Sequence, residues 1–266
     1  MALDLPRPVL KGSKALVVGI ANQHSIAYGC AKAFRELGAE LAITYVNEKT
    51  KSYVEPLARE LKASIFMPLD VSKAGELEAV FARIAKDWGR LDIALHSIAF
   101  APKSDLQGGL LDCSAEGFKV AMDISCHSFV RMAKLAAPLM KDGGTMFAMS
   151  YYGAQKVVPS YNVMGPVKAA LEACCRYLAF ELGPKKIRVH AISPGPLKTL
   201  AGAYRRAERG SPEQAPRSID DDVYCRVLDP LHLLGIGDLL LGAVDDDPGD
   251  HPGLQPERRA HRQQRR

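Results

Sequence analysis

The architecture of this chain is set by residues 15–38, which read ALVVGIANQHSIAYGCAKAFRELG. The apolar run from Ala15 to Gly19 is rich in Val and Leu, which is typical of a strand buried on both faces of a parallel sheet. A helical pattern follows from about Ser25 to Leu37, and Gly38 ends it in a C-cap position. A strand, a turn of small residues and a helix in this order predict the first unit of an α/β fold.

The same alternation of apolar runs and helical patterns continues to about residue 192. It predicts a doubly wound, Rossmann-like parallel sheet of six strands with helices on both faces. The expected strands are residues 15–19, 41–45, 65–69, 91–96, 145–149 and 188–192. The expected helices are residues 25–37, 49–61, 75–88, 115–140 and 162–182.

Composition limits the classes of protein that fit. The 266 residues are 47% hydrophobic and carry a net charge of +5, which suits one large α/β domain. No segment approaches the roughly 20 unbroken apolar residues that a membrane-spanning helix needs. The six cysteines form no C-x-x-C pair, which argues against a disulfide framework or a metal site. We therefore expect a soluble, cytoplasmic protein without a metal.

The turn after the first strand, GIANQHSIA from Gly19 to Ala27, is suited to a phosphate group. Small residues let backbone N–H groups approach a pyrophosphate, and the N-terminus of the next helix adds partial positive charge. Ser25 can cap that helix or hydrogen-bond a phosphate. This is not the G-x-G-x-x-G pattern, because Ala21 and Ser25 occupy places where glycines are commoner, so a plain strand–turn–helix is the alternative. Its place on the first βα unit favours dinucleotide binding.

Residues after the second and third strands bear on the adenosine end of such a cofactor. Asp70 ends the third strand, where it could accept from an adenine amino group or cap a turn, and Val71 follows it. Residues 46–49 offer no carboxylate clearly placed for a ribose 2′-hydroxyl, while Lys49 or Lys51 could bind a 2′-phosphate. The sequence therefore leaves NADH and NADPH both open.

A candidate catalytic pair lies in residues 150–168, which read SYYGAQKVVPSYNVMGPVK. Tyr161 and Lys168 are seven residues apart, close to two helical turns, so we expect both on one helix face. An ammonium near a phenol lowers the phenol's pKa towards neutral, and the same lysine can hold ribose hydroxyls. Pro166 fits if the helix begins near Asn162. A surface tyrosine with a solvated lysine is the alternative, but the carboxyl end of the sheet favours catalysis.

The chain changes character near residue 200. All 17 lysines lie at or before Lys198, and the ten basic residues that follow are arginines. Six prolines follow Ser211, and periodicity largely fails. We expect a dinucleotide-binding domain at residues 1–203 and an atypical, poorly ordered C-terminal segment at residues 204–266.

The chain resembles the bacterial NADH-dependent enoyl-[acyl-carrier-protein] reductases, a branch of the short-chain dehydrogenase/reductase superfamily, from about residue 8 to about residue 203. Four segments carry the resemblance: GIANQHSIA from Gly19, HSIAFAP from His96, Tyr151 with YNVMGPVK from Tyr161, and ISPGPLKT from Ile192. The Tyr-x6-Lys spacing is specific, because most of the superfamily has Tyr-x3-Lys with an upstream serine. Here Met164 stands four residues before Lys168, and Tyr151 takes the region of that serine.

The resemblance implies an enzyme of fatty-acid biosynthesis that transfers hydride from NADH to C3 of a trans-2-enoyl thioester on acyl carrier protein. It implies a homotetramer with no nucleic-acid or membrane partner. Tyr161 would stabilise or protonate the enolate oxygen, and Lys168 would bind the nicotinamide ribose. The implied substrate contacts are Ala101, Tyr151 and Met164. The implied cofactor contacts are Gly19, Ser25, Ile26, Asp70, Val71, Ser97, Ile98, Lys168, Leu197 and Thr199.

The chain departs from the family pattern in two places. Val46 stands where many members have a glutamine, and we find no counterpart of the helical substrate lid and final strand that follow ISPGPLKT. A slip of the reading frame shortly after Leu200 is one hypothesis, and sequencing the encoding DNA tests it. The alternatives are therefore a catalytically impaired or dead dinucleotide-binding protein, or another short-chain reductase. Nucleic-acid binding through residues 258–266 is disfavoured, because that arginine-rich end has no aromatic residue.

Overall fold

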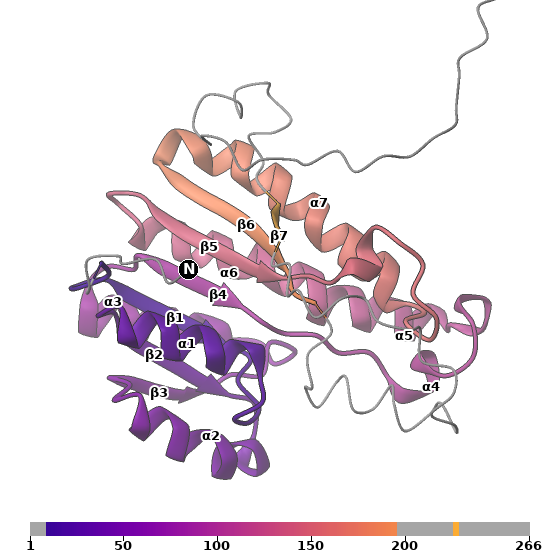
Figure 1. The fold of residues 1–266 in the computed structure, drawn as a ribbon, viewed down its shortest axis with the longest axis horizontal. Helices are drawn as coiled ribbons and strands as arrows, with labels where there is room; N and C mark the ends of the chain where they lie inside the picture. The colour runs from indigo at the N-terminus through magenta and orange to yellow at the C-terminus, as the bar shows by residue number, and fades with distance from the viewer. Residues whose placement is uncertain (1–8, 196–225, 229–266) are drawn as a thin grey trace, which may run out of the picture. The chain divides into compact units, whose positions relative to one another are not determined.

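The sheet of this protein is seen in a computed structural model that describes residues 9–195 and 226–228 (Figure 1). Its strands lie in the order β3-β2-β1-β4-β5-β6-β7. The strand bounds are β1 (Lys14–Val18), β2 (Glu40–Tyr45), β3 (Ile65–Pro68), β4 (Ile93–His96), β5 (Gly144–Met149), β6 (Ile187–Ser193) and β7 (Arg226–Leu228). Strands β1 to β6 pair in parallel, so the predicted doubly wound sheet is confirmed. The sequence analysis missed β7, which pairs antiparallel with β6 and is only three residues long.

The winding of the sheet reverses between β1 and β4. Strands β2 and β3 lie on one side of β1, and strands β4, β5 and β6 continue on the other. Val18 pairs with His96 in register, so the carboxyl ends of β1 and β4 lie next to each other. Open α/β sheets bind ligands in the crevice at such a reversal.

The helices connect these strands. The expected helices lie within two residues of their predicted positions, with one exception, and a short helix at residues 103–106 was not predicted. Their bounds are α1 (Ile26–Glu36), α2 (Glu48–Glu60), α3 (Glu76–Trp88), α4 (Lys103–Leu106), α5 (Ala115–Met122), α6 (Ser128–Ala136) and α7 (Met164–Leu182). Side chains cap the N-termini of α2 and α5. Asn47 Oδ1 accepts from Thr50 N at 3.0 Å, and Ser114 Oγ accepts from Gly117 N at 2.9 Å. Such caps satisfy N–H groups that have no partner within the helix.

The exception is the stretch expected as one helix over residues 115–140. The structure divides it into α5, a π-helical segment η2 (Asp123–His127), α6 and a 3-10 turn η3 (Ala137–Leu139). Apolar spacing does not distinguish a π-turn from an α-turn over five residues, so periodicity alone missed the interruption. π-turns inside helices are rare and frequently lie at functional sites.

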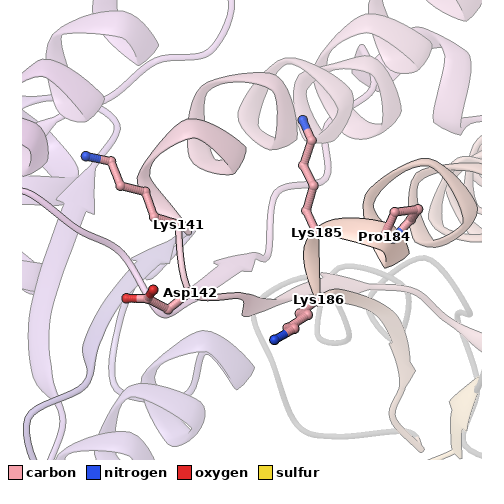
Figure 2. Close-up of a pocket in the computed structure, with 5 residues that line it drawn as sticks. All are labelled: Lys141, Asp142, Pro184, Lys185 and Lys186. Atoms are coloured by element: carbon pink, nitrogen blue, oxygen red, sulfur yellow. The ribbon is translucent and has the colours of Figure 1, made fainter.

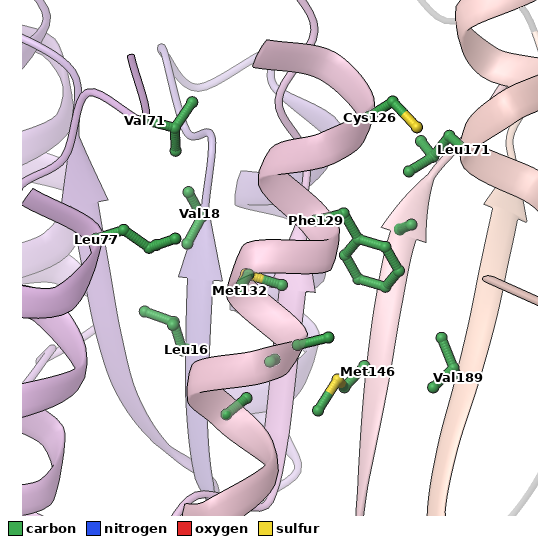
Figure 3. Close-up of a cluster of buried hydrophobic side chains, with 14 of the residues drawn as sticks. Leu16, Val18, Val71, Leu77, Cys126, Phe129, Met132, Met146, Leu171 and Val189 are labelled. Atoms are coloured by element: carbon green, nitrogen blue, oxygen red, sulfur yellow. The ribbon is translucent and has the colours of Figure 1, made fainter. Parts of the chain in front are cut away.

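Side chains of β1 alternate between two hydrophobic clusters, as the period of a strand requires. Leu16 and Val18 point into one cluster, which also holds Leu77 of α3, Phe129 of α6 and Leu171 of α7 (Figure 3). The other face packs against α1 and α2. Helices therefore cover both faces of the sheet, as predicted.

Some expectations fall outside the described residues. These are the domain boundary at residues 203–204, the cofactor contacts Leu197 and Thr199, and the arginine-rich residues 258–266. Within the described part of the chain, no helix is both long and apolar enough to cross a bilayer. The same residues include no group of three or more His, Cys, Asp or Glu side chains arranged to hold a metal ion.

Candidate functional site

The carboxyl ends of β1 and β4 approach each other at Gly19 and Ser97. Gly19 has a φ of +104°, and a Cβ built on it would lie 2.1 Å from Ser97 O. Ser97 N in turn donates to Val18 O at 2.9 Å, which extends the β1–β4 pairing by one step. A side chain at position 19 would therefore clash with backbone in a conformation that side chains rarely adopt. At Gly19 the predicted cofactor site is therefore formed by backbone atoms, without a side chain.

The loop between β1 and α1 is folded around Ser25. Its hydroxyl accepts from Ala21 N at 3.0 Å and from Asn22 N at 3.1 Å, and it makes no capping bond to α1. Of the two roles considered for the Ser25 hydroxyl, a cap or a phosphate partner, the structure does not show the cap, because the hydroxyl accepts from the loop's own N–H groups. His24 in this loop is exposed.

Helix α1 begins directly after this loop and fits a pyrophosphate. The first N–H that pairs within the helix belongs to Tyr28, so the N–H groups of Ile26 and Ala27 lie ahead of the intrahelical bonds. The first turn contains no acidic residue, so no carboxylate there would repel an anion. Together with the bare backbone at Gly19, this end of the helix is suited to a dinucleotide.

The two lysines considered as partners for a 2′-phosphate, Lys49 and Lys51, follow β2. Lys51 Nζ lies 3.4 Å from Glu48 Oε2 and 5.6 Å from the centre of the Tyr45 ring. The hydrogen bond and charge of Glu48 raise the pKa of Lys51. Lys49 is exposed, and Val46 is 42% exposed. Of the two lysines considered from the sequence, Lys51 is thus paired with an acidic neighbour.

Asp70 closes its own turn after β3. Its Oδ1 accepts from Ser72 N at 3.0 Å and from Ser72 Oγ at 2.6 Å. This is the turn role that the sequence analysis held open beside an adenine contact. Val71 is buried, and its carbonyl accepts from Arg131 at 3.0 Å.

Tyr161 lies in the turn ahead of α7, which begins at Met164. Ser160 and Asn162 on either side of it have positive φ values of 61° and 43°. The expectation that Tyr161 and Lys168 are two turns apart on one helix is therefore wrong in its geometry. Asn162, with its positive φ, interrupts a regular helical backbone between Tyr161 and Lys168, and the spacing of the two residues in the sequence did not reveal this. Pro166 falls in the first turn of α7, where its missing N–H costs nothing.

Tyr161 and Tyr151 nevertheless meet. Their ring centres are 4.9 Å apart at an interplanar angle of 66°, an edge-to-face contact. Gly153 makes room for them, because a Cβ there would lie 2.4 Å from Tyr161 Cδ1 and 3.2 Å from Tyr151 Cδ1. Gly153 has no signal in the sequence for this role, since only the folded chain brings it against these rings.

Lys168 of α7 is 4% exposed and contacts the last residue of β5. Its Nζ donates to Met149 O at 2.6 Å. Burial lowers its pKa to about 8, while the neighbouring Cys126, Cys175 and Glu172 act in the opposite direction. At pH 7 the side chain is therefore mainly an ammonium.

The predicted substrate contacts share one hydrophobic cluster. Tyr161, Met164 and Ala101 are buried in it, and Tyr151 and Ile98 pack against it. The segment that carries Ile98 and Ala101 is held by Ser125 of η2: Ser125 Oγ accepts from Phe100 N at 2.8 Å and donates to Phe100 O at 2.9 Å. The π-helical segment thus anchors the loop after β4.

His96 is packed in the core. It is 1% exposed, and its Nε2 lies 2.7 Å from Ser128 Oγ. Burial, followed by the charge of Lys168, lowers the pKa of His96 to about 3. The ring is therefore neutral near pH 7 and does not serve as a base there.

A surface cavity of about 300 Å³ lies near the amino ends of β5 and β6 (Figure 2). It is lined by Lys141, Asp142, Pro184, Lys185 and Lys186, from the segments that precede β5 and β6. Its lysine ammonium groups do not converge on one point in Figure 2. None of the residues that line this cavity belongs to the predicted cofactor or substrate site.

Comparisons with known proteins show which family this chain is similar to. A family model described as enoyl-(acyl carrier protein) reductase matches residues 19–220. The enoyl-[acyl-carrier-protein] reductase [NADH] 2 of Rhizobium meliloti is 48% identical over 195 residues, which cover 73% of each chain. The corresponding NADH enzyme of Aquifex aeolicus is 46% identical over 194 residues, which cover 73% of this chain and 72% of the relative. The crystal structure of the reductase from Anaplasma phagocytophilum in complex with NAD has 48% identity and a TM-score of 0.70. That match covers 72% of this chain and 73% of the other.

Proposed function

Since the chain belongs to the enoyl-[acyl-carrier-protein] reductase family, we propose that it reduces trans-2-enoyl groups on acyl carrier protein with NADH. The product is the saturated acyl thioester, so the reaction is a step of fatty-acid biosynthesis. Two observations carry the proposal: the edge-to-face contact of Tyr151 with Tyr161, and the hydrogen bond from Lys168 to Met149 O at the carboxyl end of β5. Tyr161 and Lys168 are the residues of the Tyr-x6-Lys motif, and Tyr151 is its upstream tyrosine.

The crevice at the end of β1 would hold the dinucleotide. The N-terminus of α1 would face the pyrophosphate, and the bare backbone at Gly19 would admit it. When bound, the nicotinamide supplies the hydride. The residues proposed to contact the cofactor are Gly19, Ser25, Ile26, Asp70, Val71, Ser97, Ile98, Lys168, Leu197 and Thr199.

NADH is proposed over NADPH on two grounds. The relatives that match are named as NADH enzymes. In addition, Lys51 is paired with Glu48, which leaves its charge less available to a 2′-phosphate.

Tyr161 would act at the thioester oxygen. Hydride addition at C3 of the enoyl group moves the π electrons toward the carbonyl and gives an enolate, which is then protonated at C2. A hydroxyl donor aimed at the oxygen stabilises the charge that develops there. Tyr161 would supply this hydrogen bond, and its buried setting strengthens the interaction.

Lys168 would bind the ribose hydroxyls next to the nicotinamide. Its ammonium has three donors, and Met149 O takes one of them. The remaining donors and the charge also favour the hydrogen bond from Tyr161 to the enolate. Tyr151, Met164 and Ala101 would line the acyl group, because they lie in or against the same hydrophobic cluster as Tyr161.

The assembly and location are also proposals. We propose a cytoplasmic homotetramer, as the family resemblance implies. The outer side of α7 supports subunit contact, since Tyr177 and Phe180 are 73% and 79% exposed there. Light scattering after size-exclusion chromatography measures the oligomeric mass, and a monomer would contradict the tetramer.

The experiment is a spectrophotometric assay of NADH oxidation with crotonyl coenzyme A. The wild type should oxidise NADH, and Tyr161→Phe should lower kcat by about 100-fold or more, the usual loss with one oxyanion donor. Tyr53→Phe is the matched control, because Tyr53 is a 58% exposed tyrosine of α2. Unchanged activity of Tyr161→Phe would remove that residue from the mechanism.

The same assay separates the alternatives. NADH binding without oxidation would identify a dinucleotide-binding protein that has lost catalysis. Failure to bind NADH at any pH would refute the proposal as a whole. Activity with a ketone but not with the enoyl thioester would indicate another short-chain reductase.

A further inference from the structure

Helix α7 buries two charged side chains, Lys168 and Glu172, which are 4% and 5% exposed. They are four residues apart and are therefore neighbours on one side of the helix. A carboxylate out of water is costly unless hydrogen bonds and opposite charge compensate it. The mechanism above uses Lys168 and gives no role to Glu172.

The partner of Glu172 is Ser150, the residue directly before Tyr151. Ser150 Oγ donates to Glu172 Oε1 at 2.6 Å, and Ser150 N donates to a carbonyl of β6 at 2.7 Å. One residue earlier, Met149 O accepts from Lys168 Nζ at 2.6 Å. The two buried charged side chains of α7 thus bind consecutive residues at the end of β5, directly before Tyr151.

Other titratable side chains near the Lys168 ammonium come from β4, η2 and α7. Burial lowers the pKa of His96 to about 3, so that ring is neutral. Burial raises the pKa of both Cys126 and Cys175 to about 12, so they are uncharged thiols at pH 8. Among these groups, Glu172 is therefore the one that supplies negative charge to Lys168 near neutral pH.

We propose that Glu172 is a positioning residue for the reduction, which fixes Tyr151 through Ser150 and keeps Lys168 in its ammonium form. The inference rests on the proposed function, because it assigns Tyr151 and Lys168 their roles. Its two parts are separable. A glutamine amide still accepts the Ser150 hydrogen bond but carries no charge, whereas Ser150→Ala removes the bond and keeps the charge.

The charge is tested with Glu172→Gln in the full chain without cofactor. Lysine labelled with 13C at Cε reports the titration of Lys168 by NMR, and Lys168→Arg assigns its signal. The wild-type midpoint is expected at about pH 8. Glu172→Gln should lower it by about one pH unit, the smaller end of the effect of a nearby charge. Glu181→Gln is the control, because Glu181 is an exposed glutamate of the same helix.

The hydrogen bond is tested with Ser150→Ala. Loss of the bond should shift the ring NMR signals of Tyr151 and raise KM for crotonyl coenzyme A several-fold, with a smaller change in kcat. Glu172→Gln keeps the acceptor, so its KM at pH 6.5 should stay close to that of the wild type. As the pH is raised, the NADH affinity of Glu172→Gln should begin to fall at a lower pH than that of the wild type, because its Lys168 loses the proton at a lower pH.

Each result decides one part of the proposal. Equal Lys168 midpoints in the wild type and Glu172→Gln would overturn the charge role. Unshifted Tyr151 signals in Ser150→Ala would overturn the positioning role. A wild type that oxidises no NADH would refute the proposed function instead, and the two NMR measurements would still decide what Glu172 does.

Discussion

Gly19→Ala is the change that tests the cofactor crevice most sharply. Position 19 has a φ of +104°, where residues with a Cβ are strained, and it faces backbone and not a flexible side chain. The added Cβ would lie 2.1 Å from Ser97 O, whereas Cβ contacts essentially never fall below 3.0 Å. The chain after β1 or the chain after β4 must therefore retreat by about 0.9 Å.

The expected cost combines strain and lost contact. A left-handed conformation costs an alanine about 1–2 kcal/mol relative to glycine. Separating the two segments also weakens the hydrogen bond from Ser97 N to Val18 O, which contributes about 1 kcal/mol. We expect the free energy of unfolding to fall by about 2–3 kcal/mol in total. NADH affinity should fall as well, because the displaced loop includes the predicted pyrophosphate site.

Two measurements check this prediction. Urea unfolding gives the change in stability, and quenching of protein fluorescence or enhancement of NADH fluorescence gives the dissociation constant. Gly29→Ala is the matched control: Gly29 lies in α1, and a Cβ there meets nothing within 4 Å. That control should gain about 0.5–1 kcal/mol, the helix preference of alanine over glycine. A Gly19→Ala protein with wild-type stability and NADH affinity would refute the reasoning.

Three further predictions concern the core and the buried titratable groups. Phe129→Ala should cost about 3–5 kcal/mol in urea unfolding, because the ring is 0% exposed, and a loss no larger than that of the 79% exposed Phe180→Ala would contradict its place in the core. Burial lowers the pKa of Lys168 from 10.5 to about 8, so between these values the unfolded chain holds a proton that the folded chain has released. The wild type should thus gain stability relative to Lys168→Met as the pH rises from 8 to 10, and a constant difference would count against a buried ammonium. Burial also raises the pKa of Cys126 and Cys175 to about 12, so Cys126→Ser and Cys175→Ser should leave the fast phase of thiol labelling of the native protein at pH 8 intact. Loss of that phase in either variant would show an accessible thiolate.

Sequence patterns predicted the sheet because burial on two faces and helical periodicity are local properties. The Val- and Leu-rich run before Gly19 became β1, and the turn after it leads into α1 as expected. The sequence patterns did not predict the backbone conformation of individual residues in turns. Ser160 and Asn162 have positive φ values, and neither residue type predicts such a conformation from the sequence. Tyr161 therefore lies outside the helix to which its spacing from Lys168 had assigned it.

Contacts between distant segments were also beyond the sequence patterns. Ser150 and Glu172 are 22 residues apart, and only the packing of α7 on the end of β5 brings them to 2.6 Å. Gly153 is similar, since its need for a bare backbone comes from the Tyr161 ring. A glutamate at a buried helical position, four residues after a candidate catalytic lysine, is the signal that could have identified Glu172.

The most direct test of the account follows the hydride itself. NADH carrying two deuterons at C4 of the nicotinamide is mixed with crotonyl coenzyme A and the protein, and the product is analysed by NMR. Enoyl reduction predicts one deuteron at C3 of the butyryl chain and a solvent proton at C2. No NADH oxidation, or a butyryl product without deuterium at C3, would contradict it.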